Sequence, residues 1–137
     1  MKTIRCDISI VMQIEEDVIL IDIVPDKDFE IKDFNQLFEA AREIGGGKKF
    51  YNLVNVGEHT TPSHEARVAS TSVEGSIFKK ADAFIIHSYS QKFIANFYLN
   101  FHKPVVPTRF FNSMDHAKKW IAELQKAERE AQNKESV

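Results

Sequence analysis

The feature that most constrains the fold is an alternation between two kinds of apolar pattern along the chain. Short continuous runs rich in β-branched or aromatic residues occupy positions 18–24, 50–56 and 81–87, whereas apolar residues at positions 34–44 recur every three or four positions. The short runs predict strands that are buried on both faces, and the longer pattern predicts an amphipathic helix. Strands that alternate with helices form a mostly parallel sheet with helical cover. The sequence therefore predicts an α/β fold.

The first strand of the predicted sheet differs from the others. Apolar and polar residues alternate over 8–14, and a short polar turn at 15–17 leads into the run 18–24, so these two strands are predicted to pair antiparallel. The further predicted elements are helices at 34–44, 62–73, 90–101 and from 113 onward, and strands at 50–56, 81–87 and 108–111. We therefore expect a mixed, mostly parallel five-stranded sheet with about four helices.

One domain accounts for the whole predicted core. Residues 1–125 contain every predicted strand and helix, and residues 126–137 are charged and lack large apolar side chains, as in a partly frayed C-terminal helix or tail. The helix at 62–73 is predicted to start at Thr61 as N-cap, with Pro62 in its first turn.

Composition limits the compartment and the partners. The net charge of −2 gives no broad attraction for nucleic acid, and the single cysteine, Cys6, cannot form an internal disulfide. Charges near the N-terminus interrupt any signal-peptide core, and no apolar run approaches the ~20 residues that span a bilayer. We expect a cytoplasmic protein that binds no nucleic acid and has no stable membrane insertion.

Ligands of open α/β sheets bind beyond the carboxyl ends of the parallel strands. That rule gathers the loops 25–29, 57–63, 87–90 and 112–113 on one rim of the predicted sheet. The candidate binding residues on this rim are Glu58, His59, Thr60, Thr61, Ser63, His64, His87 and Ser88.

The polar residues of the rim could bind a metal, catalyse a reaction or serve only structural roles. Three histidines (His59, His64, His87) could in principle hold zinc, but sequence separation fixes none of their distances. His87 and Ser88 with Glu58 could suggest nucleophilic catalysis, but the Gly-x-Ser-x-Gly context is missing. The hydroxyls at 60–63 serve as helix caps or, alternatively, as modification sites. We predict no metal site, no cofactor and no catalytic residue.

Phenylalanine is abundant, with 11 residues in 137, and several lie in the helix at 90–101. Phe93, Ile94, Phe97 and Phe101 fall on one stripe, which predicts that they belong to the core. Asn96 and Tyr98 lie off that stripe and are candidates for a groove or a dimer surface.

The order of elements and several short segments carry a resemblance to a known family. The segments are KADAFII at 80–86, FFNS at 110–113, AKKWI at 117–121 and IANFY at 94–98. With the opening strand pair and the final amphipathic helix, they resemble the STAS fold of anti-sigma-factor antagonists and, more closely, the SpoIIAA-like proteins. The loop 57–63 lacks the Asp-Ser-Gly pattern that is phosphorylated in those antagonists.

The resemblance implies a non-catalytic regulatory or protein-interaction module whose partner is an unknown protein. SpoIIAA-like proteins have also been compared with lipid-carrying domains. The alternative is therefore a carrier or sensor of an apolar small molecule or lipid that uses a phenylalanine-rich groove. A homodimer is compatible with either function.

Overall fold

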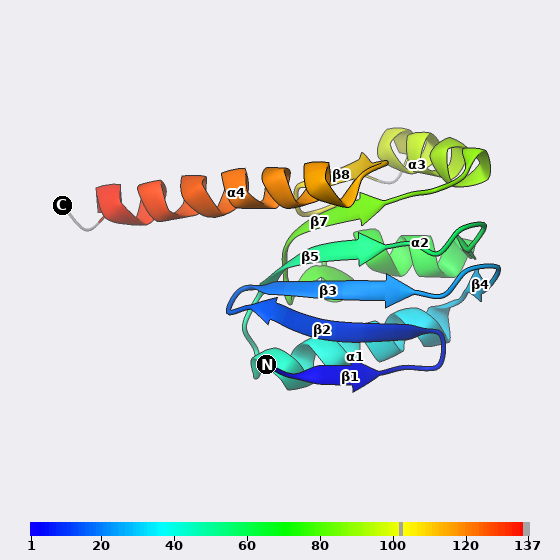
Figure 1. Ribbon diagram of the computed structural model, residues 1–137, viewed down its shortest axis with the longest axis horizontal. Coiled ribbons are helices and arrows are strands. Elements are labelled where there is room, and N and C mark those ends of the chain that lie inside the picture. Colours follow the sequence, from blue (N-terminus) through cyan, green and yellow to red (C-terminus); the bar gives the residue numbers. More distant parts are fainter. Residues whose placement is uncertain (102, 136–137) are drawn as a thin grey trace.

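The computed structural model describes residues 1–101 and 103–135, and its strands and helices alternate along the chain as the sequence predicts (Figure 1). The strands are β1 (Thr3–Arg5), β2 (Ser9–Glu15), β3 (Val18–Ile23), β4 (Asp28–Phe29), β5 (Phe50–Asn55), β6 (Thr61–Pro62), β7 (Lys79–Ile85) and β8 (Thr108–Phe111). The helices are α1 (Ile31–Gly45), α2 (His64–Thr71), the 3-10 turn η1 (Glu74–Ser76), α3 (Tyr89–Phe101) and α4 (Met114–Glu135).

The main sheet has six strands in the order β1-β2-β3-β5-β7-β8. The pairs β1–β2 and β2–β3 are antiparallel, and the pairs β3–β5, β5–β7 and β7–β8 are parallel. The predicted mixed, mostly parallel sheet is therefore confirmed. The predicted strand number was one too low, because Thr3–Arg5 adds an edge strand too short to show a periodic pattern.

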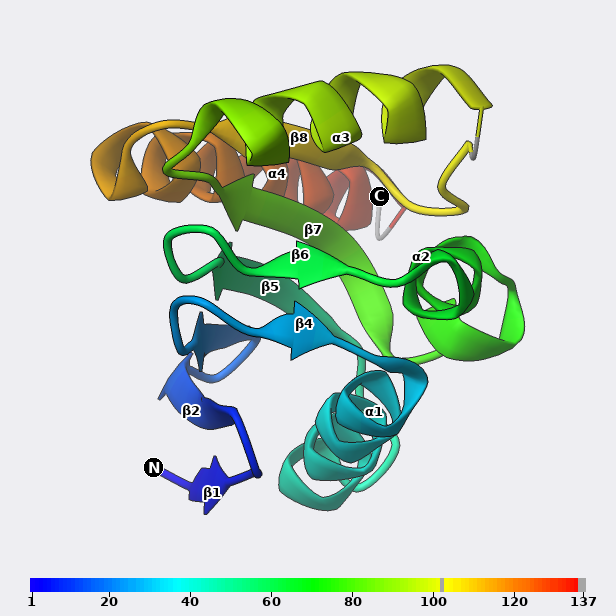
Figure 2. The same ribbon diagram turned by 90° about the vertical axis from the view of Figure 1, so that its right-hand side faces the viewer.

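Helices cover the two faces of this sheet unequally. α4 packs on one face, whereas α1, α2 and α3 lie on the other side (Figure 2). Because side chains alternate along a strand, Leu53 of β5 and Ala83 of β7 belong to the cluster beneath α4, whereas Val54 lies in the cluster beneath α1 and α2. The molecule is thus a three-layer α/β structure with separate cores on its two sheet faces.

A second, two-stranded sheet joins β4 to β6 in parallel, with Asp28 opposite Thr61 and Phe29 opposite Pro62. This pairing corrects the predicted start of the second helix, because Thr61 and Pro62 are extended. Ser63 is the N-cap, and its hydroxyl accepts the backbone N–H of Ala66 at 3.1 Å. A two-residue strand draws its stability from a distant partner and leaves no local pattern in the sequence.

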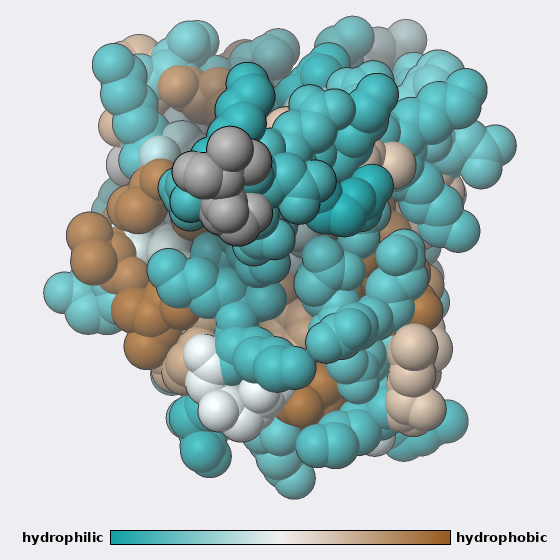
Figure 3. Space-filling view, turned by 90° about the vertical axis from the view of Figure 1, so that its left-hand side faces the viewer, coloured by the Kyte–Doolittle hydropathy of each residue, from teal (hydrophilic) through white to brown (hydrophobic). Residues whose placement is uncertain are grey.

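α4 continues as a helix past residue 125, the predicted end of the domain; residues 136–137 of the predicted tail lie outside the described part of the chain. Hydrophilic residues dominate the end of the molecule toward which α4 points (Figure 3). None of the helices in the described ranges is long and apolar enough to cross a membrane.

Glu128 ties the outer half of α4 to the sheet. Its carboxylate accepts hydrogen bonds from the Lys80 ammonium, at 2.7 Å, and from the Tyr51 hydroxyl. Both bonds lower the pKa of Glu128 below its ordinary value. Burial, and after it the bond to Glu128, raise the pKa of Tyr51 above its ordinary value.

Replacing Glu128 with glutamine is expected to lower the free energy of unfolding by about 1 kcal/mol at pH 7, since the ion pair is partly exposed. A carboxylate with a lowered native pKa stabilises the fold above its unfolded value of about 4.3 and loses this effect as the pH falls through the native pKa. Urea unfolding of both proteins should therefore converge in acid. Glu123→Gln, an exposed change on α4, is the control; a pH-independent difference would contradict the assignment.

Candidate ligand-binding site

The loops 25–29 and 57–63, which belong to the rim predicted from the sequence, carry an exposed polar cluster. His59 adopts a left-handed backbone conformation, with φ of 68°. Its Nδ1 lies 3.1 Å from Asp26 Oδ1, and its Nε2 lies 3.7 Å from Glu58 Oε1. The three side chains are more than half exposed. These residues form a solvated polar cluster.

The hydroxyls of the rim have structural partners. Thr60 is buried; its hydroxyl donates to the carbonyl of Val24 at 2.6 Å and accepts the backbone N–H of Lys27 at 3.1 Å. The side-chain amide of Gln91 donates to the carbonyls of Thr60 and Gly57 at 2.8 and 2.7 Å. These bonds fasten the strand-end loops to α3.

The remaining rim residues form a line across the strand ends. Asn55 Nδ2 donates to Asp22 Oδ1 at 3.0 Å, and His87 Nε2 lies 2.7 Å from Asn55 Oδ1. Since an amide oxygen only accepts, His87 donates from Nε2. Ser88 Oγ lies 3.2 Å from Ser90 Oγ.

The three rim histidines do not form a common site. His64 is an exposed residue at the start of α2, His59 lies beside Asp26, and His87 lies beside Asn55. Within the described ranges, no three His, Cys, Asp or Glu side chains are grouped so as to hold a metal ion.

α3 corrects the prediction for the phenylalanine stripe. Phe93 and Phe101 are 74% and 68% exposed, whereas Gln91, Ala95 and Tyr98 are buried. The helix is rotated so that Gln91 can bond the strand-end carbonyls, and this rotation turns the phenylalanines outward. Asn96, the other residue predicted off the stripe, is exposed.

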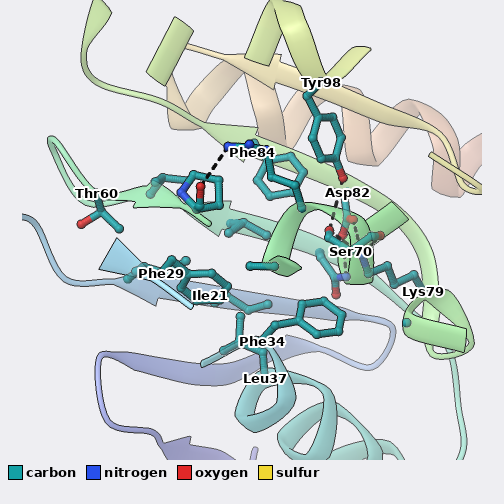
Figure 4. A pocket seen from close by; sticks show the side chains of 18 of the residues that line it. Ile21, Phe29, Phe34, Leu37, Thr60, Ser70, Lys79, Asp82, Phe84 and Tyr98 are labelled. Atoms are coloured by element: carbon teal, nitrogen blue, oxygen red, sulfur yellow. Dashed lines mark hydrogen bonds and ion pairs between the residues drawn. The ribbon is translucent and has the colours of Figure 1, made fainter. Parts of the chain in front are cut away.

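Beneath α3 the structure contains a cavity of about 140 Å³ between the sheet and α1, α2 and α3. Most of its wall is apolar and buried (Figure 4). The apolar wall residues labelled there include Ile21 of β3, Phe29 of β4, Phe34 and Leu37 of α1, and Phe84 of β7. The loss of van der Waals contact around such a space costs stability, so a persistent apolar cavity in a native core is a candidate ligand site.

One part of the cavity wall is polar. Asp82 is buried and its carboxylate forms an ion pair with the Lys79 ammonium at 2.7 Å; it also accepts a hydrogen bond from Asn52 Nδ2 at 2.7 Å. Lys79 additionally donates to the carbonyl of Ser70 at 3.0 Å. Figure 4 shows Tyr98 reaching from α3 toward this cluster, and its hydroxyl donates to Ser70 Oγ at 3.3 Å.

Two polar atoms in this wall lack a hydrogen-bond partner among the described residues: Asn52 Oδ1 and Arg67 Nε. The Asp82 carboxylate can only accept, so it fixes the Asn52 amide with nitrogen toward Asp82 and oxygen away from it. A buried acceptor without a partner costs about 1–3 kcal/mol, so water or a donor group on a ligand must satisfy it.

Tyr98 contributes a neutral hydroxyl to the cavity. Burial raises the pKa of Tyr98 to about 12, against a smaller lowering by its bond to Ser70. The group therefore stays protonated at neutral pH and acts as a hydrogen-bonding wall residue.

The sequence singles out Tyr98 as a candidate for a groove or a dimer surface, but none of the other residues of the polar cluster was predicted. The signal was present, because Asn52 and Asp82 each interrupt an otherwise apolar strand and are register partners in the β5–β7 pair. Polar residues in the middle of buried strands need each other or a ligand.

Comparison with known proteins bears on the fold and the family. A family model described as a domain of unknown function (DUF7793) matches residues 12–125. No curated protein matches the sequence. Among solved structures, a crystal structure of an uncharacterized protein of the DUF3478 family with a SpoIIAA-like fold, from Shewanella loihica PV-4, is similar with a TM-score of 0.55. The two chains are 14% identical, and the match covers 80% of this chain and 89% of the other. The SpoIIAA-like fold predicted from the sequence is confirmed.

Proposed function

Since the chain belongs to the DUF7793 family of domains of unknown function, we propose from its structure that it binds a small, mainly apolar molecule in the cavity beneath α3. The observation that carries this proposal is the combination of apolar walls with one polar cluster that leaves Asn52 Oδ1 without a protein partner. We propose carriage or sensing of this molecule, with no chemical step.

The size of the cavity supports a small ligand. An apolar protein cavity of about 150 Å³ accommodates benzene, and the volume here is about 140 Å³. A single ring or a short branched chain fits this space without rearrangement of the core.

The polar cluster favours a ligand that carries a hydrogen-bond donor, because Asn52 Oδ1 is an acceptor without a protein partner. Asn52 Oδ1 accepts and Arg67 Nε donates, whereas Lys79 and Asp82 satisfy each other. A hydroxyl or a ring N–H can give Asn52 its missing bond, and a charged head group would have to enter a buried site already neutralised by an ion pair.

The regulatory role implied by the fold resemblance stays a prediction. In the loop 57–63, which lacks the phosphorylated pattern of the antagonists, the Thr60 and Ser63 hydroxyls form structural hydrogen bonds. We place the ligand in the cavity because Asn52 Oδ1 and Arg67 Nε in its wall have no hydrogen-bond partner, whereas the Thr60 and Ser63 hydroxyls have partners.

Native mass spectrometry of the purified protein beside its denatured mass is the first test. The proposal expects a non-covalent adduct of small mass in part of the sample. The emptied protein is then titrated with phenol and with toluene, which have similar shape but differ in the hydroxyl, and chemical shifts of the cavity residues are followed by NMR. We expect phenol to bind at least as tightly as toluene, because the hydroxyl can bond Asn52.

The titrations test the cavity and the role of Asn52 separately. Binding of neither probe to a protein that carries no adduct would overturn the proposal. A clear preference for toluene would leave an apolar cavity but would contradict the role of Asn52.

A further inference from the structure

α3 presents two different faces. Its inner face, with Gln91, Ala95 and Tyr98, lines the cavity. Its outer face carries aromatic side chains four residues apart, which places them along one side of the helix. We call these residues the aromatic stripe: Tyr89, 93% exposed; Phe93, 74%; Phe97, 44%; and Phe101, 68%.

The aromatic stripe is an exposed apolar surface of unusual kind. Single exposed apolar residues are ordinary, but a contiguous row of large ones marks an interaction surface. The rings of Phe97 and Phe101 lie 4.5 Å apart, so the stripe is continuous at its C-terminal end. Leu99 of the same helix and Val105 of the following loop are also exposed, 41% and 55%.

The chain segment that carries the stripe contains basic residues and no acidic ones. Residues 83–114 include three basic residues, Lys92, Lys103 and Arg109, and no aspartate or glutamate, although the whole chain carries 20 acidic residues and a net charge of −2. A groove between α3 and β8 is lined in part by His87, Lys92 and Arg109 and by no acidic residue. This side of the molecule therefore favours an anionic partner.

We propose that α3 docks the protein peripherally on an anionic lipid bilayer, with the aromatic stripe at the level of the head groups. Amphipathic rings and nearby cations are the combination that holds helices in the bilayer interface. The observations favour this occupant over a second copy, because a symmetric dimer through α3 would bring the basic residues of two copies into one interface, and α3 holds no acidic residue to pair with them. The inference rests on the exposed face of α3 and not on the cavity ligand.

Docking in this orientation would have a consequence for the cavity. The same helix would contact the bilayer with one face and the cavity with the other, so a membrane-dissolved apolar molecule would be one helix away from the site. Movement of α3 alone would open a path between the bilayer and the cavity.

The test is sedimentation of the full chain with vesicles. One set is pure phosphatidylcholine, and the other contains phosphatidylglycerol as the anionic lipid. We expect binding to the anionic vesicles that weakens as salt increases, since screening reduces the attraction of exposed charges.

Two variants assign the surface. Phe93→Ser/Phe101→Ser removes two exposed rings without touching the core, and we expect it to lower vesicle partitioning by about 50-fold. Lys92→Glu reverses one charge and should lower it by about 30-fold, from about 1 kcal/mol for each unit of charge near an anionic surface. Val73→Ser, at a position 65% exposed on another part of the molecule, and Lys118→Glu on α4 are the matched controls and should bind like the wild type.

Three results would overturn the inference. They are equal sedimentation with and without anionic lipid, equal loss in the controls, and a concentration-dependent dimer in analytical ultracentrifugation that the phenylalanine variant abolishes. Phenol binding in the cavity without vesicle binding would overturn the docking of α3 and leave the proposed function standing.

Discussion

Replacing Asp82 with leucine is expected to lower the free energy of unfolding by about 3–5 kcal/mol, because it leaves the Lys79 ammonium buried without its counter-charge. The Asp82 side chain is 3% exposed and that of Lys79 is 11% exposed, so water does not readily replace the lost partner. Asn52 Nδ2 would lose its acceptor at the same time. Urea unfolding at neutral pH measures the change.

The double variant Lys79→Met/Asp82→Leu shows how much of the lost stability comes from the unpaired charge and how much comes from the change of side-chain shape. Removing both charges should recover most of the lost stability, apart from about 1 kcal/mol for the unpaired Asn52 amide. The double variant also keeps the test valid where the single variant does not fold. A cost below about 1 kcal/mol for Asp82→Leu alone would mean that water reaches Lys79, and the polar cluster would then belong to an open cleft.

The strands of the central sheet could be predicted because their sequence signal is local. The runs 18–24, 50–56 and 81–87 became β3, β5 and β7 with their ends shifted by at most two residues. Each lies between two strands of the sheet and most of its side chains are buried, so the run is mainly apolar, with Asn52 and Asp82 as the buried polar exceptions.

Elements whose stability comes from a distant partner could not be predicted in this way. β1 has three residues, and β4 and β6 have two each. Their ladders join positions that are up to 33 residues apart, such as Asp28 and Thr61. No periodic pattern fits into two residues, so the sequence alone favoured a helix start at Thr61 and Pro62.

α3 shows that a helix can be located without its rotation being known. Hydrophobicity alone predicts that Phe93 and Phe101 face the core. Gln91 faces it instead, because its amide is the donor for the carbonyls of Gly57 and Thr60. Those carbonyls lie more than 30 residues from Gln91 in the sequence and meet its amide only in the folded chain, so the deciding interaction is tertiary.

In the candidate site, too, one part could be predicted from the sequence and the other could not. The polar cluster had a sequence signal in Asn52 and Asp82, two polar residues in neighbouring apolar strands. The cavity had none, because an unfilled volume depends on how α1, α2 and α3 sit on the sheet, and composition does not encode it.

Replacing Ala66 with leucine is expected to lower the affinity for phenol by at least about 100-fold, because the longer side chain enters the space that the ligand needs. Ala66 is 2% exposed and lines the cavity from α2. Since room exists for the added carbons, the free energy of unfolding should stay within about 1 kcal/mol of the wild type or rise. Ala95→Leu, which approaches the cavity from α3, should act in the same way. NMR titration and urea unfolding measure the two quantities.

The same substitution on the opposite sheet face is the matched control. Ala117 of α4 is fully buried in the cluster formed with Ala81 and Ala83, where small residues let the helix approach the sheet closely. Ala117→Leu should therefore lower the free energy of unfolding by about 1–3 kcal/mol and leave phenol binding unchanged. Equal destabilisation by Ala66→Leu and Ala117→Leu would mean that the core beneath α3 is as closely packed as the core beneath α4. The cavity would then close in solution, and the protein would have no interior site for a ligand.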